Sequence, residues 1–333
     1  MGDMPVAALE ARRDDITTRR ARAVAVGLYL VIFLAWVIKI GIPTDSLLIF
    51  GWIWAATVAW NIQAPRRQHL EFVRDWWIPL AVLLVYLYSR GSADEVGLFS
   101  VHFTPPIEID RWLFGGALPT QYLQDRWCGT ECSYAVPPNW YDVTFTAWYY
   151  SHFLVAPTVA VVLWLRNRDS WLRFMRPYLA INVVGLIGYI TVPTAPPWMA
   201  SEEGLIPGGV RRLTGRGFAE IGLGGFHQQL ANTGNPVAAM PSLHAGIGAL
   251  VVMYGVYRLR TWWRWLLLAY PVIMSTMLVY YGEHYVIDIL AGWAAAGLVL
   301  VGSHVWETRF NRIPDDEHQT AGAAATCRDT RDD

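Results

Sequence analysis

Long apolar runs recur along almost the whole sequence, and they constrain the fold more than any other feature. Of the 333 residues, 54% are hydrophobic and only 16% are charged, a composition unlike that of a soluble domain. In lipid, backbone polar groups must be satisfied within their own segment, so such runs form helices. We therefore predict an all-α integral membrane protein with about eight transmembrane helices. The expected spans are 23–42, 45–62, 75–90, 141–165, 174–192, 241–258, 262–281 and 285–307.

Arginine is distributed unevenly among the segments that connect these runs. It is frequent before the first run, in every second connection and after the last run, whereas Lys39 is the only lysine. Cytoplasmic loops carry the excess of positive charge, so both termini are predicted to be cytoplasmic. The connections 42–45, 91–140, 193–240 and 282–284 then lie outside. Arginine in place of lysine indicates a GC-rich genome, and a bacterial plasma membrane is the expected location.

The chain divides into four regions by composition. The second contains Ile107-Glu-Ile-Asp-Arg-Trp-Leu-Phe114, which suits either a helix lying in the membrane interface or an ordinary loop. The last region is rich in Asp, Ala and Thr and has little to bury. The regions are a cytoplasmic segment 1–22, N-terminal helices with an outer loop 23–140, a membrane core 141–307 and a disordered cytoplasmic tail 308–333.

Cys128 and Cys132 lie in the first long outer loop. An oxidising compartment would permit a disulfide between them, and we predict that they are bonded. Two free thiols are the alternative, because so short a loop closes only with suitable geometry.

A histidine stands at the expected outer start of the sixth run, in Pro241-Ser-Leu-His244. Ser242 before an apolar run is a typical helix start. The N-terminus of a helix presents unpaired N–H groups and a positive dipole, and both attract phosphate. Ser242 and His244 are therefore candidate site residues, although a lone histidine near the interface is often only a hydrated polar side chain.

A second histidine enters the last run in His284-Tyr-Val-Ile-Asp288. Four residues make about one helical turn, so Asp288 can accept a proton from one imidazole nitrogen of His284. The other nitrogen is then held as a nucleophile. A His–Asp pair that only joins two helices is the alternative, but ionisable groups at membrane depth are usually functional. The arginine distribution brings His244 and His284 to the same outer face by different helices.

These two motifs resemble those of the type 2 phosphatidic acid phosphatase superfamily, which has Pro-Ser-Gly-His followed by His-x3-Asp. Leu243 replaces the glycine. With Thr194-Ala-Pro-Pro-Trp198 upstream, the chain looks more like the branch that contains fungal inositol phosphorylceramide synthase. Asp142 and His152 on the fourth run also resemble that branch, and they either gate the acceptor or join helices.

Two departures from the superfamily pattern concern its basic residues. Arg176-Pro177 resembles the end of the first motif, but its lysine position is Asp169 and the topology places it inside. The arginine that usually precedes the last histidine is also absent. We therefore take Arg211, Arg212 and Arg216 as candidate phosphate-binding cations, with a solvated or headgroup-facing cluster as the alternative.

The resemblance implies a catalytic core in which His284 forms a phosphohistidine, Asp288 orients it and His244 acts as acid and base. We expect a phosphotransferase that passes a head-group phosphate, such as phosphoinositol, from a phospholipid to a lipid or glycan hydroxyl. A lipid or polyprenyl phosphate phosphatase is the alternative, and a non-enzymatic transporter is a weaker one. No cofactor, metal ion or nucleic-acid partner is expected.

Overall fold

The computed structural model describes residues 6–40, 46–91, 99–129, 132, 137–218, 235 and 237–310. Within these ranges the regular structure is helical, apart from two isolated bridges that join His102 to Thr194 and Thr194 to Ala238. The prediction of an all-α fold is confirmed.

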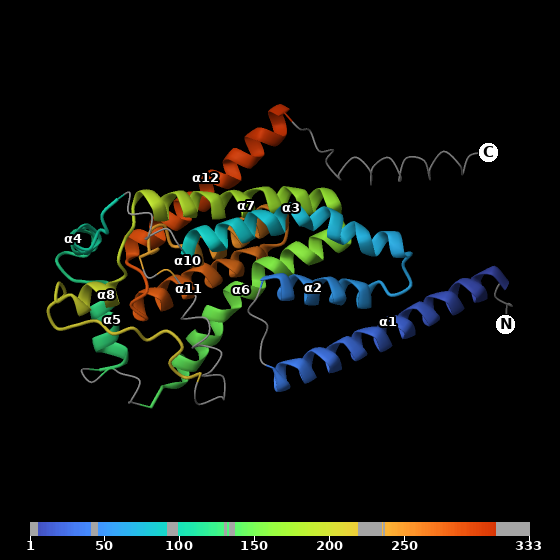
Figure 1. The fold of residues 1–333 in the computed structure, drawn as a ribbon, viewed down its shortest axis with the longest axis horizontal. Coiled ribbons are helices and arrows are strands. Elements are labelled where there is room, and N and C mark those ends of the chain that lie inside the picture. The colour runs from blue at the N-terminus through green and yellow to red at the C-terminus, as the bar shows by residue number, and fades with distance from the viewer. Residues whose placement is uncertain are drawn as a thin grey trace.

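Each expected span corresponds to a helical segment, and these segments form the body of the molecule (Figure 1). Five of them are long and apolar enough to cross a membrane: α1, α6, α7, the combined η1–α11 and α12. The expected count of eight crossings stays a prediction. The segments are α1 (Val6–Lys39), α2 (Ser46–Trp60), α3 (Arg66–Gly91), α6 (Trp140–Arg166), α7 (Arg168–Thr191), α10 (Leu243–Arg258), η1 (Trp262–Leu268) with α11 (Ala269–Tyr280), and α12 (Val286–Phe310).

Helix α3 begins well before the expected run 75–90. Its first turns alternate charged and apolar residues, so they do not form a continuous apolar run. Phe72 is nevertheless fully buried, and its ring lies 5.0 Å from the rings of both Trp76 and Trp164. Packing of one aromatic face against α6 thus extends α3 into a segment that is polar on its other side.

The first and the last of the predicted region boundaries fall well within helices. Helix α1 covers 6–39, so most of the segment 1–22 is continuous with the first span. Helix α12 continues to Phe310, and the remainder of the tail predicted at 308–333 lies outside the described residues.

Three short helices gather at one end of the bundle, where α10 begins (Figure 1). They are α4 (Thr104–Leu113), α5 (Pro119–Trp127) and α8 (Pro197–Glu202). Helix α4 overlaps the segment 107–114, for which a helix in the membrane interface and an ordinary loop were the two alternatives. The segment is helical, and its relation to a membrane stays a prediction.

The opposite end of the bundle collects the arginine-rich ends of helices. Arg168 forms an ion pair with Asp75 at 3.2 Å, which links α7 to α3. Arg258 donates a hydrogen bond to the Ser170 hydroxyl at 3.0 Å, which links α10 to α7. The start of α10 and the short helices therefore lie at the end that is poorer in these arginines.

Candidate active site

The N-terminus of α10 carries Ser242 and His244. Ser242 is the N-cap residue, and its hydroxyl accepts a hydrogen bond from the Ala245 backbone N–H at 3.3 Å. Its own N–H donates to the Asp288 carbonyl at 3.0 Å. His244 follows in the first turn and is half-buried. The start of α10 is thus tied directly to the first turn of α12.

His284 precedes α12 by two residues and lies beside the carboxylate of Asp288. Nδ1 of His284 is 3.5 Å from Oδ2 of Asp288, and that oxygen also accepts the Tyr285 N–H at 2.9 Å. Asp288 is fully buried and His284 is 5% exposed. With Nδ1 turned toward the carboxylate, Nε2 is the nitrogen on the opposite side of the ring.

The two histidines approach each other across the interface between α10 and α12. Their ring centroids are 6.0 Å apart. This separation puts both imidazoles within reach of a single phosphoryl group, which needs a nucleophile and a proton donor on opposite sides. The arginine distribution in the sequence predicted only that the two histidines lie at the same face of the membrane.

Glycines allow this close approach of the two helices. A Cβ on Gly292 would lie 2.3 Å from the Ser242 carbonyl oxygen, and one on Gly246 would lie 2.9 Å from the Gly292 carbonyl oxygen. Small residues let membrane helices pack backbone against backbone. The contact lies one turn after Asp288 on α12 and two residues after His244 on α10, and it therefore sets the separation of the two histidines.

A glycine on α7 accommodates Leu243, the residue that departs from the superfamily motif. A Cβ on Gly185 would come within 2.6 Å of the Leu243 side chain. A Cβ on Gly188 would lie 2.4 Å from Pro241. The surface of α7 is thus shaped to receive the turn that precedes His244.

Helix α6 supplies a third histidine to this group. The ring of His152 lies 4.6 Å from that of His244, and Tyr149 stacks on His244 at 4.9 Å. We call His152, His244, His284 and Asp288 the histidine cluster. His152, for which a role in joining helices was the favoured alternative, lies beside a candidate catalytic side chain.

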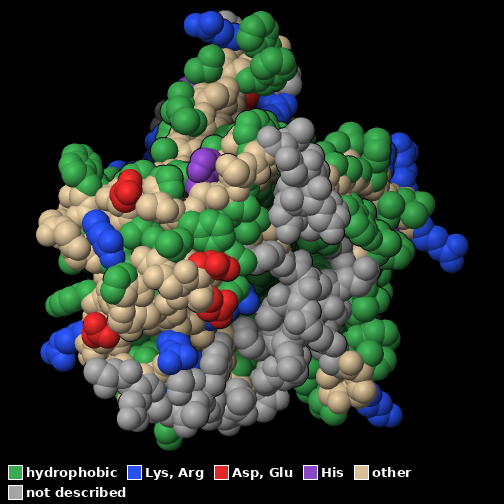
Figure 2. Space-filling view, turned by 60° about the vertical axis from the view of Figure 1, so that its left-hand side comes forward, with side chains coloured by type: hydrophobic (Ala, Val, Ile, Leu, Met, Phe, Trp, Pro, Cys, Tyr) green, Lys and Arg blue, Asp and Glu red, His purple; other side chains and the backbone are tan. Residues whose placement is uncertain are grey.

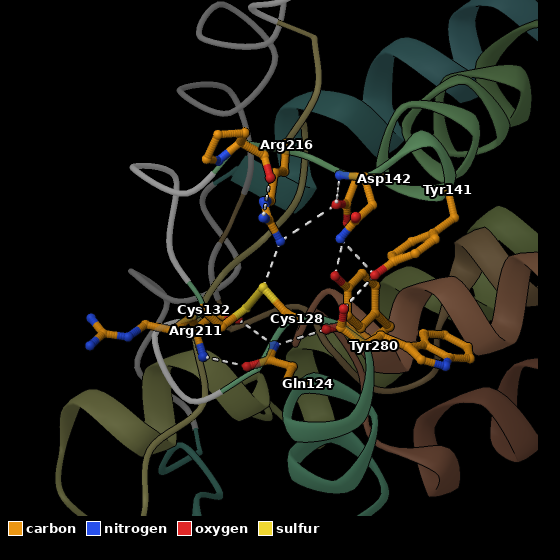
Figure 3. Close-up of a disulfide and its surroundings, with 11 residues drawn as sticks. Gln124, Cys128, Cys132, Tyr141, Asp142, Arg211, Arg216 and Tyr280 are labelled. Carbon is orange, nitrogen blue, oxygen red and sulfur yellow. Dashed lines mark hydrogen bonds and ion pairs between the residues drawn. A yellow bond between two sulfur atoms is a disulfide. The ribbon is translucent and has the colours of Figure 1, made fainter.

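Asp142, also on α6, belongs to a different group that surrounds the disulfide (Figure 3). Its carboxylate is 3.5 Å from the Arg216 guanidinium and accepts the Tyr280 hydroxyl at 2.8 Å. Arg216 also donates to the Cys128 sulfur at 2.6 Å, and Cys128 is joined to Cys132 by a disulfide. We call Asp142, Arg216, Tyr280 and the two cysteines the arginine cluster.

The three candidate arginines therefore do not converge on one point. Arg216 is 2% exposed and belongs to the arginine cluster. Arg212 forms an ion pair with Glu283 at 2.8 Å, and its guanidinium lies 5.0 Å from the centroid of the Trp198 ring. The Arg211 side chain extends away from the arginine cluster in Figure 3. The structure thus brings Ser242 and the histidine cluster together and disperses the cations.

Comparison with known proteins shows which family contains this chain. The model of the PAP2 superfamily matches residues 137–302. The phosphoinositol dihydroceramide synthase of Bacteroides thetaiotaomicron is 33% identical over 222 residues, which cover 63% of this chain and 67% of that protein. The chain belongs to the PAP2 superfamily. It is an integral membrane enzyme with the phosphotransferase or phosphatase chemistry of that superfamily, as the resemblance implied. No solved structure shows significant similarity to it.

One residue of this PAP2 protein that contacts the site region was not anticipated. Asp110 on α4 is fully buried and accepts hydrogen bonds from the backbone N–H groups of Val286 and Ile287, at 2.9 and 3.0 Å. The mixture of charged and apolar residues in 107–114 was the only signal in the sequence. Nothing in that signal indicates the distant partner.

The end of the PAP2 protein that carries α4, α5 and α8 is chemically mixed. Side chains of both charges lie among apolar ones on this face (Figure 2). Among the residues that the structure describes, no group of three or more His, Cys, Asp or Glu side chains is arranged to hold a metal ion.

Proposed function

We propose that this enzyme transfers phosphoinositol from a phospholipid to the hydroxyl of a ceramide-like lipid by way of a phosphohistidine. The observation that carries the proposal is the pair of imidazoles, His244 and His284, 6.0 Å apart with Asp288 beside His284. The name of the Bacteroides relative supports the choice of donor group and acceptor. A phospholipid and a lipid acceptor are the partners that such a reaction needs.

In the first half-reaction, Nε2 of His284 attacks phosphorus while His244 protonates the departing diacylglycerol oxygen. The N–P bond forms as the P–O bond to diacylglycerol breaks. Asp288, facing Nδ1, holds the ring and stabilises the positive charge that develops on it.

In the second half-reaction, His244 accepts the proton of the acceptor hydroxyl, whose oxygen attacks phosphorus. The N–P bond breaks and His284 is regenerated. Water in place of the acceptor would make the same residues a phosphatase, which is the second candidate. The burial of His284 favours transfer, because it limits access of water to the intermediate.

The negative charge of the transferred phosphate is stabilised first by the N-terminus of α10, whose dipole points at the histidine cluster. Asp110 occupies the corresponding N–H groups of α12. Of the three candidate arginines, Arg212 is the one that we propose for contact with the phosphate, because its ion-pair partner Glu283 directly precedes His284.

We further propose that the site faces the outside of the cell membrane, because the arginine-rich helix ends lie at the other end of the bundle. A cysteine at Arg211, an exposed position, should react with a membrane-impermeant maleimide in intact cells. Protection until the cells are lysed would place the site in the cytoplasm.

The function is tested by incubating purified enzyme in vesicles with inositol-labelled phosphatidylinositol and dihydroceramide. We expect a labelled sphingolipid that requires both lipids, and no product with His284→Ala. Release of labelled inositol phosphate at a rate independent of acceptor would favour the phosphatase, and neither product would refute both.

A further inference from the structure

Helix α4 lies outside the spanning helices but packs one face against the start of α12. Ile107 and Asp110, one turn apart, point inward and are 2% and 0% exposed. The opposite face carries Glu108 and Trp112, of which Trp112 is 80% exposed. A helix with such a divided surface is held in one rotational setting by its buried side.

Asp110 contacts the backbone between the candidate nucleophile and its orienting carboxylate. Oδ2 accepts the N–H of Val286, and Oδ1 accepts that of Ile287. These residues are the first two of α12, and the N–H groups in the first turn of a helix have no partner within the helix. The carboxylate thus caps α12 from a remote part of the chain.

This arrangement brings a second carboxylate close to Asp288. Burial raises the pKa of Asp110 to about 6, the two N–H groups oppose that rise, and the charge of Asp288 adds to it. A local Ser or Asn cap would satisfy one N–H without burying a charge. Because each oxygen of the carboxylate accepts one N–H group, the cap restrains both residues that follow Tyr285. It thereby fixes the backbone that carries His284.

We infer that Asp110 is a positioning residue for the nucleophile. Through Val286 and Ile287 it fixes the first turn of α12, and with it the alignment of His284 between Asp288 and His244. This inference rests on the proposed role of His284 as the attacking group. It also means that α4, a short helix far from α12 in the sequence, takes part in assembling the site.

The test compares Asp110→Asn with Glu108→Gln, which removes one charge from the exposed side of the same helix. Asparagine keeps one accepting oxygen but turns an NH₂ group toward a backbone N–H. Losing an outer hydrogen bond that orients a metal ligand typically costs about 10–100-fold in activity, and we take the same range for the residue that orients this nucleophile. We expect that fall in kcat for Asp110→Asn, with KM for the phospholipid nearly unchanged, and no change for Glu108→Gln.

Turnover of a nitrophenyl phosphodiester should fall in the same proportion, because the lipid acceptor plays no part in it. Amide hydrogen exchange at 286–287 reports the cap without any activity, and it should be faster in Asp110→Asn only. Equal kcat for the two variants, with faster exchange in Asp110→Asn, would overturn the inference. A wild-type enzyme that turns over the nitrophenyl substrate but makes no sphingolipid would instead contradict the proposed function. If Asp110→Asn fails to fold, Asp110→Ser, which keeps one acceptor in a smaller side chain, takes its place.

Discussion

The histidine cluster and the arginine cluster both bury ionisable side chains beside α6, but they satisfy them differently. In the arginine cluster, Asp142 is bonded by Arg216, Tyr280 and the Asn139 N–H. In the histidine cluster, Nδ1 of His284 is likewise 3.5 Å from Oδ2 of Asp288, but Oδ1 of Asp288 is buried with no hydrogen-bond partner among the described residues. The comparison teaches that a carboxylate with partners on both oxygens, such as Asp142, holds helices together, whereas Asp288 keeps one oxygen available beside the proposed nucleophile.

The largest expected effect comes from changing the histidine cluster. His284→Ala removes the nucleophile and should reduce activity to background. Asp288→Asn should cost about 10⁴-fold by analogy with other triads, and His244→Ala about 10² to 10⁴-fold.

A nitrophenyl phosphoester needs little protonation of its leaving group, so it separates the two histidines. It should partly rescue His244→Ala and not His284→Ala in a steady-state assay. Rescue of His284→Ala alone would reverse the two roles. Full turnover of phospholipid by both variants would end the phosphoryl-transfer reading of this cluster.

Changing the arginine cluster should instead affect stability. Arg216→Met leaves the Asp142 charge buried without its cation, and such a loss costs about 3–5 kcal/mol in the free energy of unfolding. Arg216→Met combined with Asp142→Asn should recover part of it. Arg211→Met, at an exposed position, is the control. An Arg216→Met protein of normal stability but without activity would show that Arg216 contacts phosphate after all.

Contact between α10 and α12 can be broken without touching a polar side chain. Gly292→Ala puts a methyl group against the Ser242 carbonyl, which is backbone and cannot move cheaply. We expect a loss of about 3 kcal/mol, the upper part of the range for overpacking, together with lower kcat. Gly297→Ala on the same helix meets nothing within 4 Å and is the matched control. Similar melting temperatures for the two variants would remove the argument from close packing.

The smallest effect concerns the disulfide at the edge of the arginine cluster. Closing the short loop between Cys128 and Cys132 stabilises the protein by about 2 kcal/mol on chain-entropy grounds. Replacing both cysteines by serine should lower the unfolding free energy by that amount and leave kcat unchanged. Mass spectrometry of unreduced protein should find neither thiol alkylated, and two alkylated thiols would contradict the prediction.

The sequence predicted those parts of the site that depend on local spacing or on topology. His284 and Asp288 are four residues apart, and that spacing predicted their pairing, although His284 lies two residues before the helix begins. The apolar runs predicted the helices, and the distribution of arginines predicted which helix ends lie at the same face of the membrane. The structure places His152 beside His244, although the sequence offered no reason to prefer a place in the site over a role in joining helices.

The remaining contacts join residues that are far apart in the chain, and no periodicity reveals them. Asp110 meets Val286 and Ile287 only because α4 folds back onto α12. From the sequence, Arg216 was grouped with the neighbouring arginines as a candidate phosphate-binding cation. In the structure it instead forms an ion pair with a buried aspartate on α6. Charge alone could not distinguish a cation that awaits a ligand from one that already has a partner.

The glycine contact between α10 and α12 has a consequence for motion. Because the two helices are joined backbone to backbone, with a further hydrogen bond from Ser242 to Asp288, we expect them to move as one body. His244 and His284 then keep their spacing throughout the reaction cycle. We expect any opening that admits a lipid or releases a product to come from displacement of α6 or of the short helices α4, α5 and α8 against this pair.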